Sequence, residues 1–287
     1  MLVQSLIAIN KKKKMASFEP VPEEKILRVG YWNMRGLGSP LRMMCFFSKT
    51  TFKAECWTLP ADINYKSSAW FSTQKPIYKE RQALINLPYV IDFDSDGSEI
   101  MITQTNACMA HLGRKLGLWG VNVREISMCE MLLCEIYDLR NVVTRHAYGG
   151  TTEQNPDFIR QFTNPNASLG KLEIHLSRQT GFTEATPFLV GGHATAPDFH
   201  LFELLDQFTT FNNYNNYEDS LVNFPNIKKF YVHFGALPQM AEYLSSKLFK
   251  EIGLNNLGAN FGSMPSGEKY DASKHTPPAD ASGTYTF

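Results

Sequence analysis

Short β-branched and aromatic runs alternate with a helical stretch in the first third of the chain, and this order constrains the fold most strongly. Residues 26–32 (ILRVGYW) form a run typical of a buried strand. Ser39 and Pro40 then favour a helix start, because serine caps the first turn and proline suits the first helical position. A second strand is expected over residues 53–59, which gives a β-α-β order.

After a polar stretch that ends near residue 81, the pattern resumes with two strands and a helix. A strand over residues 87–93 opens on a proline, and residues 94–97 (DSDG) predict a hairpin turn into a strand over residues 99–104. A helix is expected from Thr105 to about residue 116. The order β-α-β followed by β-β-α is that of a thioredoxin-like domain, which we place at residues 26–116.

From residue 122 onward the periodicity is helical alone. Amphipathic stretches indicate one long helix from residue 122 and others near residues 156–178, 196–211, 225–233 and 236–249. Residues 195–198 (TAPD) form a capping-box signal, which we interpret as fold stabilisation. The predicted fold class is therefore α/β plus all-α, with an N-terminal thioredoxin-like domain followed by an all-helical domain at residues 122–249.

The two ends of the chain differ in composition from the middle. Residues 1–25 carry two prolines and clustered charge, so we expect a flexible N-terminal extension, with Met15 as an alternative start to Met1. After residue 255 only Leu257 is a branched aliphatic residue, while Gly, Pro, Ser and Asn are frequent. Such a segment buries too little apolar area to offset its ordering entropy. Residues 250–287 are therefore expected to form a disordered tail that is available to a protein partner.

Charge and cysteine content exclude several classes of function. The 28 Lys and Arg residues balance 28 Asp and Glu residues, so no net field attracts nucleic acid or an anionic membrane. No apolar run approaches the roughly 18 residues of a membrane span. The five cysteines form neither a CxxC motif nor a zinc-binding spacing, so we expect reduced thiols, no metal site and a cytoplasmic location.

Three segments together resemble the mu-class glutathione transferases. They are residues 30–37 (GYWNMRGL), 85–92 (INLPYVID) and 102–107 (ITQTNA), and they occur in the order and near the spacing of that family. The resemblance covers roughly residues 26–249. It implies a homodimeric enzyme that binds glutathione as co-substrate and conjugates its thiolate to small hydrophobic electrophiles.

The resemblance also implies roles for individual residues. Tyr31 matches the catalytic tyrosine whose hydroxyl donates to the glutathione sulfur and so favours the nucleophilic thiolate. Backbone N–H groups at a helix start suit a carboxylate, as expected at Gln104 and Thr105. Asp138 matches a residue that reaches the site of the partner subunit. The positions that match glutathione contacts are Trp32, Trp70, Gln74, Asn86, Leu87, Pro88, Gln104, Thr105 and Asp138, and those on the electrophile side are Leu37 and Tyr148.

Three departures from the family pattern leave alternatives open. Ser67 and Gln74 stand where the family has basic residues near the glycyl carboxylate, so Lys66 and Lys75, each one residue away, are the candidate replacements. The loop over residues 70–86 is about three residues longer than expected, and Leu84 replaces an aromatic that keys into the partner subunit. The alternative function is therefore a weak or inactive relative with a structural role in a larger assembly.

Overall fold

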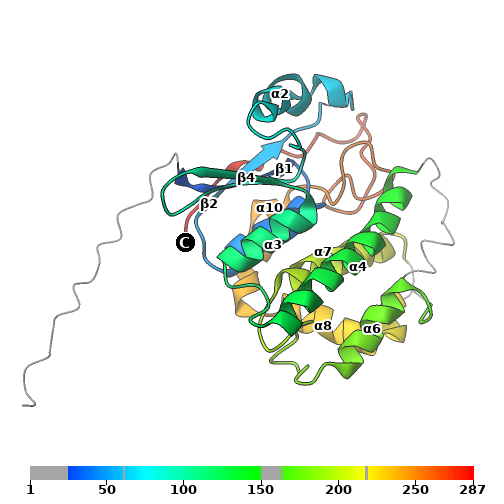
Figure 1. Ribbon diagram of the computed structural model, residues 1–287. Helices are drawn as coiled ribbons and strands as arrows, with labels where there is room; N and C mark the ends of the chain where they lie inside the picture. The colour runs from blue at the N-terminus through cyan, green and yellow to red at the C-terminus, as the bar shows by residue number, and fades with distance from the viewer. Residues whose placement is uncertain (1–24, 61, 150–161, 163, 217–218) are drawn as a thin grey trace, which may run out of the picture.

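The computed structural model describes residues 25–60, 62–149, 162, 164–216 and 219–287 (Figure 1). Nearly all of the predicted N-terminal extension, residues 1–24, lies outside these ranges. The chain begins with a sheet and two helices on one of its faces: β1 (Leu27–Trp32), α1 (Gly38–Phe47), β2 (Phe52–Trp57), β3 (Tyr89–Phe93), β4 (Glu99–Thr103) and α3 (Thr105–Lys115). β1 pairs parallel with β2 and antiparallel with β3, and β4 pairs antiparallel with β3.

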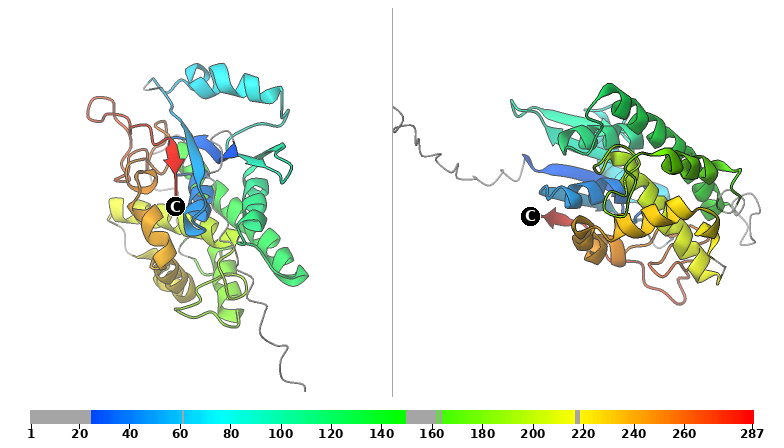
Figure 2. Two further views of the ribbon diagram at one scale, coloured as in Figure 1. Left: turned by 90° about the vertical axis from the view of Figure 1, so that its left-hand side faces the viewer. Right: turned by 90° about the horizontal axis from the view of Figure 1, so that it is seen from below.

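A helical layer follows and packs against α1 and α3 (Figures 1 and 2). Its main helices are α4 (Val123–Tyr148), α6 (Ser168–Arg178), α7 (Ala196–Tyr214) and α8 (Pro225–Gly235). The predicted helix over residues 156–178 begins outside the described ranges. The helix expected over residues 236–249 is divided into the short pieces η5 (Pro238–Met240), α9 (Ala241–Ser245) and α10 (Lys247–Lys250). This architecture confirms the predicted fold class.

The start of α7 is fixed by the predicted capping box. The Asp198 carboxylate accepts hydrogen bonds from the backbone N–H of Thr195 and of Leu189, each at 2.7 Å. Burial raises the pKa of Asp198 to about 7, although these donors oppose the shift. Because α7 is buried along most of its length and touches α1, α3, α4 and α8, this cap anchors the helix that joins the two layers.

The C-terminal residues differ from the expected disordered tail. Residues 250–287 are ordered, and β5 (Gly283–Tyr285) pairs antiparallel with β2, which puts β5 at the edge of the sheet (Figure 2, β5 in red). The segment also buries Leu257, Phe261 and Tyr270. Composition alone underestimates its stability, because a few aromatic residues add to a core that already exists and the backbone pairs with an open strand edge. Because the segment is ordered, the structure gives no support to the protein partner that was expected to bind a free tail.

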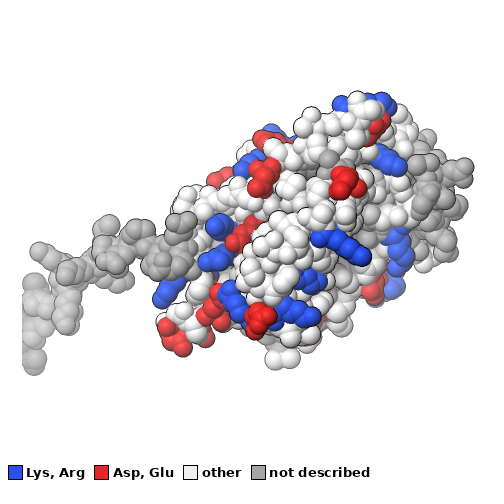
Figure 3. All heavy atoms as spheres, turned by 90° about the horizontal axis from the view of Figure 1, so that it is seen from above, with Lys and Arg blue, Asp and Glu red and all other residues white. Residues whose placement is uncertain are grey.

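Charged side chains of both signs are interspersed over the face drawn in Figure 3, in keeping with a net charge of zero. Within the described ranges, none of the helices has the length and apolar character needed to cross a membrane. The same ranges contain no group of three or more His, Cys, Asp or Glu side chains arranged to hold a metal ion.

Candidate functional site

Tyr31 lies near the end of β1 beneath the loop that leads into α1. Its side chain is only 4% exposed and packs with Met34 and Leu37, while Leu87 and Tyr137 cover the small cluster from outside. Burial raises the pKa of the Tyr31 phenol, opposed by Arg140 and by a hydrogen bond from the Leu37 backbone. The hydroxyl is therefore protonated at neutral pH and can donate a hydrogen bond.

Two glycines let the β1–α1 loop approach the Tyr31 ring closely. A Cβ at Gly36 would lie 3.1 Å from the Tyr31 hydroxyl, and one at Gly38 would lie 2.7 Å from the Tyr31 Cβ. Gly36 also has φ +38°, in the left-handed region that favours glycine. The loop therefore needs glycine at both positions to form the wall around the phenol.

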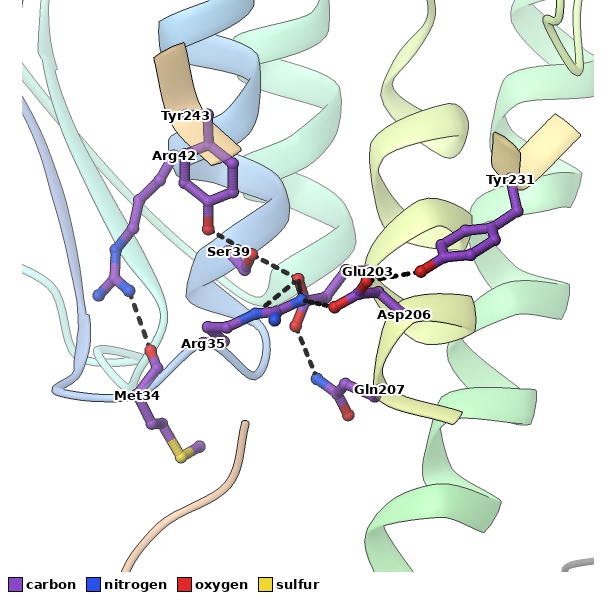
Figure 4. A network of polar contacts seen from close by, with 9 residues as sticks. All are labelled: Met34, Arg35, Ser39, Arg42, Glu203, Asp206, Gln207, Tyr231 and Tyr243. Carbon is purple, nitrogen blue, oxygen red and sulfur yellow. Dashed lines mark hydrogen bonds and ion pairs between the residues drawn. The ribbon is translucent and has the colours of Figure 1, made fainter. Parts of the chain in front are cut away.

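A buried polar network fastens this loop to α7 (Figure 4). Arg35 donates to Glu203 at 2.8 Å and to Asp206 at 2.6 Å. The Ser39 hydroxyl donates to Glu203 at 2.6 Å and lies 2.5 Å from the Tyr243 hydroxyl. Burial raises the pKa of Glu203, and the positive charge of Arg35 opposes that shift. The network holds the loop in place, and none of its residues is among the predicted site residues.

Arg42 on α1 holds the same loop from the other side. Its guanidinium is fully buried and donates to the Met34 carbonyl at 2.9 Å and to the Trp32 carbonyl at 3.2 Å. Arg42 thus fixes the backbone on either side of Asn33, while Arg35 ties the same loop to α7.

The turn before β3 brings a second group of predicted residues together. The Leu87-Pro88 peptide bond is cis. The Thr103 hydroxyl donates to the carbonyls of Asn86 and Pro88, at 3.0 and 3.2 Å, and accepts from the Asn86 N–H at 3.1 Å. Leu87 is thereby held between two anchored residues and contacts the Tyr31 cluster.

The start of α3, where the resemblance implies a carboxylate contact, lies beside this turn. Gln104 is exposed at the N-cap and has φ +74°, a strained conformation for a residue with a side chain. Its side chain makes no capping hydrogen bond, and α3 is a full 11 residues long. The first N–H groups of such a helix, together with its dipole, attract a carboxylate.

Trp70 lies deeper than the resemblance implies. Its indole is 0% exposed, stacks on Tyr89 with ring centroids 5.6 Å apart, and packs against Trp57 at the same distance. Its buried N–H has no hydrogen-bond partner among the described residues. Trp70 is therefore part of the core behind β3, and a ligand reaches its N–H only after neighbouring side chains move.

A π-helical turn shifts the register of the segment expected to bind the glycyl end. η3 (Trp70–Gln74) is π-helical and leads directly into α2 (Lys75–Lys79). A π-helical turn accommodates one more residue than an α-helical turn, so every later side chain moves to a different face. Lys75 Nζ consequently lies 3.3 Å from Asn86 Oδ1, beside the cis-proline turn. Of the two candidate lysines, the structure brings Lys75 to a predicted glutathione contact.

Trp32 is the last residue of β1, and two further predicted residues lie on α4. Asp138 is exposed on its surface. Tyr148 is the last residue of the helix, and its hydroxyl accepts a hydrogen bond from the backbone N–H of Asn256 at 2.8 Å. Burial of the hydroxyl raises the pKa of Tyr148. Asn256, which no sequence signal singled out, thus contacts Tyr148, a residue that the resemblance assigns to the electrophile side.

Comparison with known proteins finds relatives of this chain among the glutathione S-transferases. A family model described as "Glutathione S-transferase, C-terminal domain" matches residues 137–247. Solved structures with the same fold include the pi-class glutathione S-transferase of Onchocerca volvulus, with a TM-score of 0.62 and 22% identity over 81% of this chain and 99% of that one. The glutathione S-transferase Blo t 8 has a TM-score of 0.63 and 24% identity over 82% of this chain and 99% of that one.

Curated sequences narrow the resemblance further. Glutathione S-transferase Mu 1 of Oryctolagus cuniculus is 29% identical over 227 residues, which are 79% of this chain and 94% of that protein. Glutathione S-transferase Mu 3 of Homo sapiens is 27% identical over 243 residues, or 84% of this chain and 98% of that protein. These matches confirm the resemblance to mu-class glutathione transferases, and they support an enzyme of the glutathione transferase class.

Proposed function

We propose that the protein conjugates the glutathione thiolate to small hydrophobic electrophiles. The observation that carries this proposal is the buried Tyr31 phenol, which is enclosed by a loop that two arginines and two glycines fix in place. A free thiol has a pKa near ~8.5, and only the thiolate is an effective nucleophile. A donor aimed at the sulfur stabilises the thiolate at neutral pH.

The geometry supports one orientation of glutathione. Its γ-glutamyl carboxylate fits the N–H groups at Gln104 and Thr105, and its cysteinyl backbone fits beside Leu87. The glycyl carboxylate then lies toward Asn86 and Lys75. The thiolate, next to Tyr31, attacks the electrophilic carbon and forms a C–S bond, while the displaced electron pair leaves with the leaving group or moves onto an oxygen that takes up a proton.

The discriminating experiment is retention on immobilised glutathione together with conjugation of a generic aryl halide. The enzyme is expected to do both. The alternative, a structural relative without activity, is favoured by the deep burial of Trp70, and it predicts folded protein that neither binds the resin nor forms the conjugate.

Lys75→Ala is expected to weaken glutathione binding about tenfold, because it removes a charge-assisted bond to the glycyl carboxylate worth about 1.5 kcal/mol. The thiolate step is untouched, so KM rises while kcat changes little. Calorimetric titration with glutathione measures the affinity. Lys66→Ala is the matched control and should bind normally.

A reversed result, with loss of binding in Lys66→Ala alone, would contradict the assignment of Lys75. Gln74→Lys distinguishes two explanations: either Lys75 has shifted to the position where the family has a basic residue, or that basic residue has been lost. If the π-helical turn has moved Lys75 into the cation's place, a lysine at position 74 adds little affinity.

A two-fold dimer is proposed, because Asp138 is exposed on α4 and serves a glutathione ammonium only when a neighbour presents it. Leu84, 71% exposed, occupies the place of the aromatic key. Leu84→Phe is therefore expected to lower the dimer dissociation constant several-fold, because a buried aromatic adds apolar contact area. Sedimentation over a range of concentrations measures it. A strictly monomeric protein that conjugates at full rate would refute the dimer.

A further inference from the structure

The last two turns of α4 form one side of an open hollow of about 440 Å³. Its lining residues follow one another at the spacing i, i+3, i+4 and i+7, so they share one face of the helix. They are Asn141, Thr144, Arg145, Tyr148 and, just past the helix, Gly149. An amide, a hydroxyl, a guanidinium and a phenol therefore line the hollow, and none of the described residues that line it is acidic.

Tyr148 joins this hollow to the cluster around Tyr31. Its hydroxyl lies 3.9 Å from the Met34 sulfur, and Met34 packs against Tyr31. Tyr148 thus borders both the hollow and the Tyr31 cluster. In the orientation of glutathione proposed above, a group attached to the sulfur extends from Tyr31 past Tyr148 toward the hollow.

Two arginines on this part of α4 give the hollow a positive potential. Arg145 is exposed, and Arg140 lies half-buried on the preceding turn. Neither guanidinium makes an ion pair with another side chain in the part of the chain that the structure describes. Burial raises the pKa of the Tyr31 and Tyr148 phenols, and the positive charge of Arg140 opposes the shift in both. The field of Arg140 thus acts on the two tyrosines between which a substrate would pass.

The polar groups beside Arg145 offer mainly hydrogen-bond donors. The Thr144 hydroxyl donates to the Arg140 carbonyl at 3.2 Å, so its proton is already engaged. Asn141 is half-buried and lines the hollow next to Arg145, where its amide N–H groups can donate to a ligand. N–H donors around an unpaired positive charge are the chemical complement of a carboxylate.

We infer that the preferred electrophile carries a carboxylate, and that Arg145 is the specificity-determining residue that binds it; this rests on the proposed function. A guanidinium meets a carboxylate with two parallel N–H donors, which adds directional selectivity to the attraction between the charges. A purely apolar group in the same place would cover polar side chains without replacing their hydrogen bonds to water, which costs free energy. The class of electrophile is thus narrowed to compounds with an apolar reacting part and an anionic end.

Two glutathione thioethers that differ in charge test this without relying on catalysis. S-(para-carboxybenzyl)glutathione carries the carboxylate, and S-(para-carbamoylbenzyl)glutathione carries a neutral amide of nearly the same shape. Calorimetry gives both dissociation constants, and their ratio measures the preference for the anion. The variants are Arg145→Gln, which removes the charge, and Arg145→Lys, which keeps the charge without the paired donors. Arg124→Gln is the matched control, because it removes an exposed arginine about 30 Å away at the other end of α4.

The wild type is expected to bind the carboxylate thioether about tenfold more tightly than the amide thioether at low salt, and Arg145→Gln to bind the two within about twofold of each other. Arg145→Lys should keep part of the preference and Arg124→Gln all of it. Added salt should reduce the preference, because the hollow is open to solvent.

Equal dissociation constants in the wild type, or an unchanged preference in Arg145→Gln, overturn the inference, while binding of both thioethers still supports the proposed function. If folded wild-type protein binds neither thioether nor glutathione, the proposed function fails, and the inference fails with it.

Discussion

Tyr31→Phe is expected to lower kcat/KM about a hundredfold at pH 6.5 while leaving glutathione affinity nearly unchanged. Removal of one preorganised donor to a developing or bound anion typically costs 10²–10³ in rate. The hydroxyl acts on the sulfur, whereas the rest of the ring packs against Met34 and Leu37 and is retained in phenylalanine.

The pH profile identifies the cause of this loss. Without the phenol, the thiol pKa of bound glutathione moves up toward the free value near ~8.5, so the thiolate fraction falls at pH 6.5 and recovers as pH rises. The deficit should therefore shrink steadily between pH 6.5 and 9. Tyr89→Phe is the control, because its hydroxyl binds Glu55 away from the loop. Equal rates for Tyr31→Phe and wild type at pH 6.5 would remove Tyr31 from the mechanism.

The elements that the sequence predicts well are those whose signals are local. β1 and α1 follow from a β-branched run and from Ser39-Pro40, and the capping box at Thr195 and Asp198 is present as expected. Gln104 is placed at a helix start by the strand-to-helix change alone. In each case hydrogen bonds within a few residues decide the conformation, so neighbouring sequence carries the information.

Other features depend on contacts between distant residues. Residues 250–287 are ordered because β5 pairs with the edge of β2 and because backbone N–H groups of the β1–α1 loop donate hydrogen bonds to this segment. The composition of the segment reveals neither of these contacts. The π-helical turn at residues 70–74 appears in the sequence only as a loop of unexpected length. Trp70 matches a glutathione contact of the family, and its burial and its stacking on Tyr89 are set by tertiary packing that the local sequence does not reveal.

Glu203 is the one residue whose place in the sequence could have predicted the buried polar network. It is a carboxylate within the apolar run of α7, where an unpaired charge would be costly, and so it demands a cation from elsewhere in the fold. Arg35 lies in the segment that carries Tyr31, 168 residues away in sequence. The sequence of α7 therefore indicates that Glu203 needs a cationic partner, but it does not identify which residue provides the cation.

Arg35→Met is expected to lower the free energy of unfolding by about 3–5 kcal/mol at pH 7, the usual cost of breaking a buried ion pair from one side. The variant leaves Glu203 and Asp206 side by side without their cation. Urea unfolding monitored by circular dichroism measures the loss. Arg145→Met, at an exposed position on α4, should change stability by less than about 0.5 kcal/mol.

The sign of the pH dependence separates this electrostatic cause from a simple loss of packing. Burial already raises the pKa of Glu203, and the removal of Arg35 raises it further. A carboxyl whose folded pKa exceeds its unfolded pKa stabilises fully below the unfolded value, and that stability is lost as pH rises through the folded value. The deficit of Arg35→Met relative to wild type should therefore be smaller at pH 5 than at pH 8.

Adding Glu203→Gln should recover part of the stability at pH 8 and little at pH 5. A deficit that is constant with pH, with no recovery in the double variant, would mean that Arg35 acts through its packing on Phe249, 4.0 Å from that ring, and not through the carboxylates.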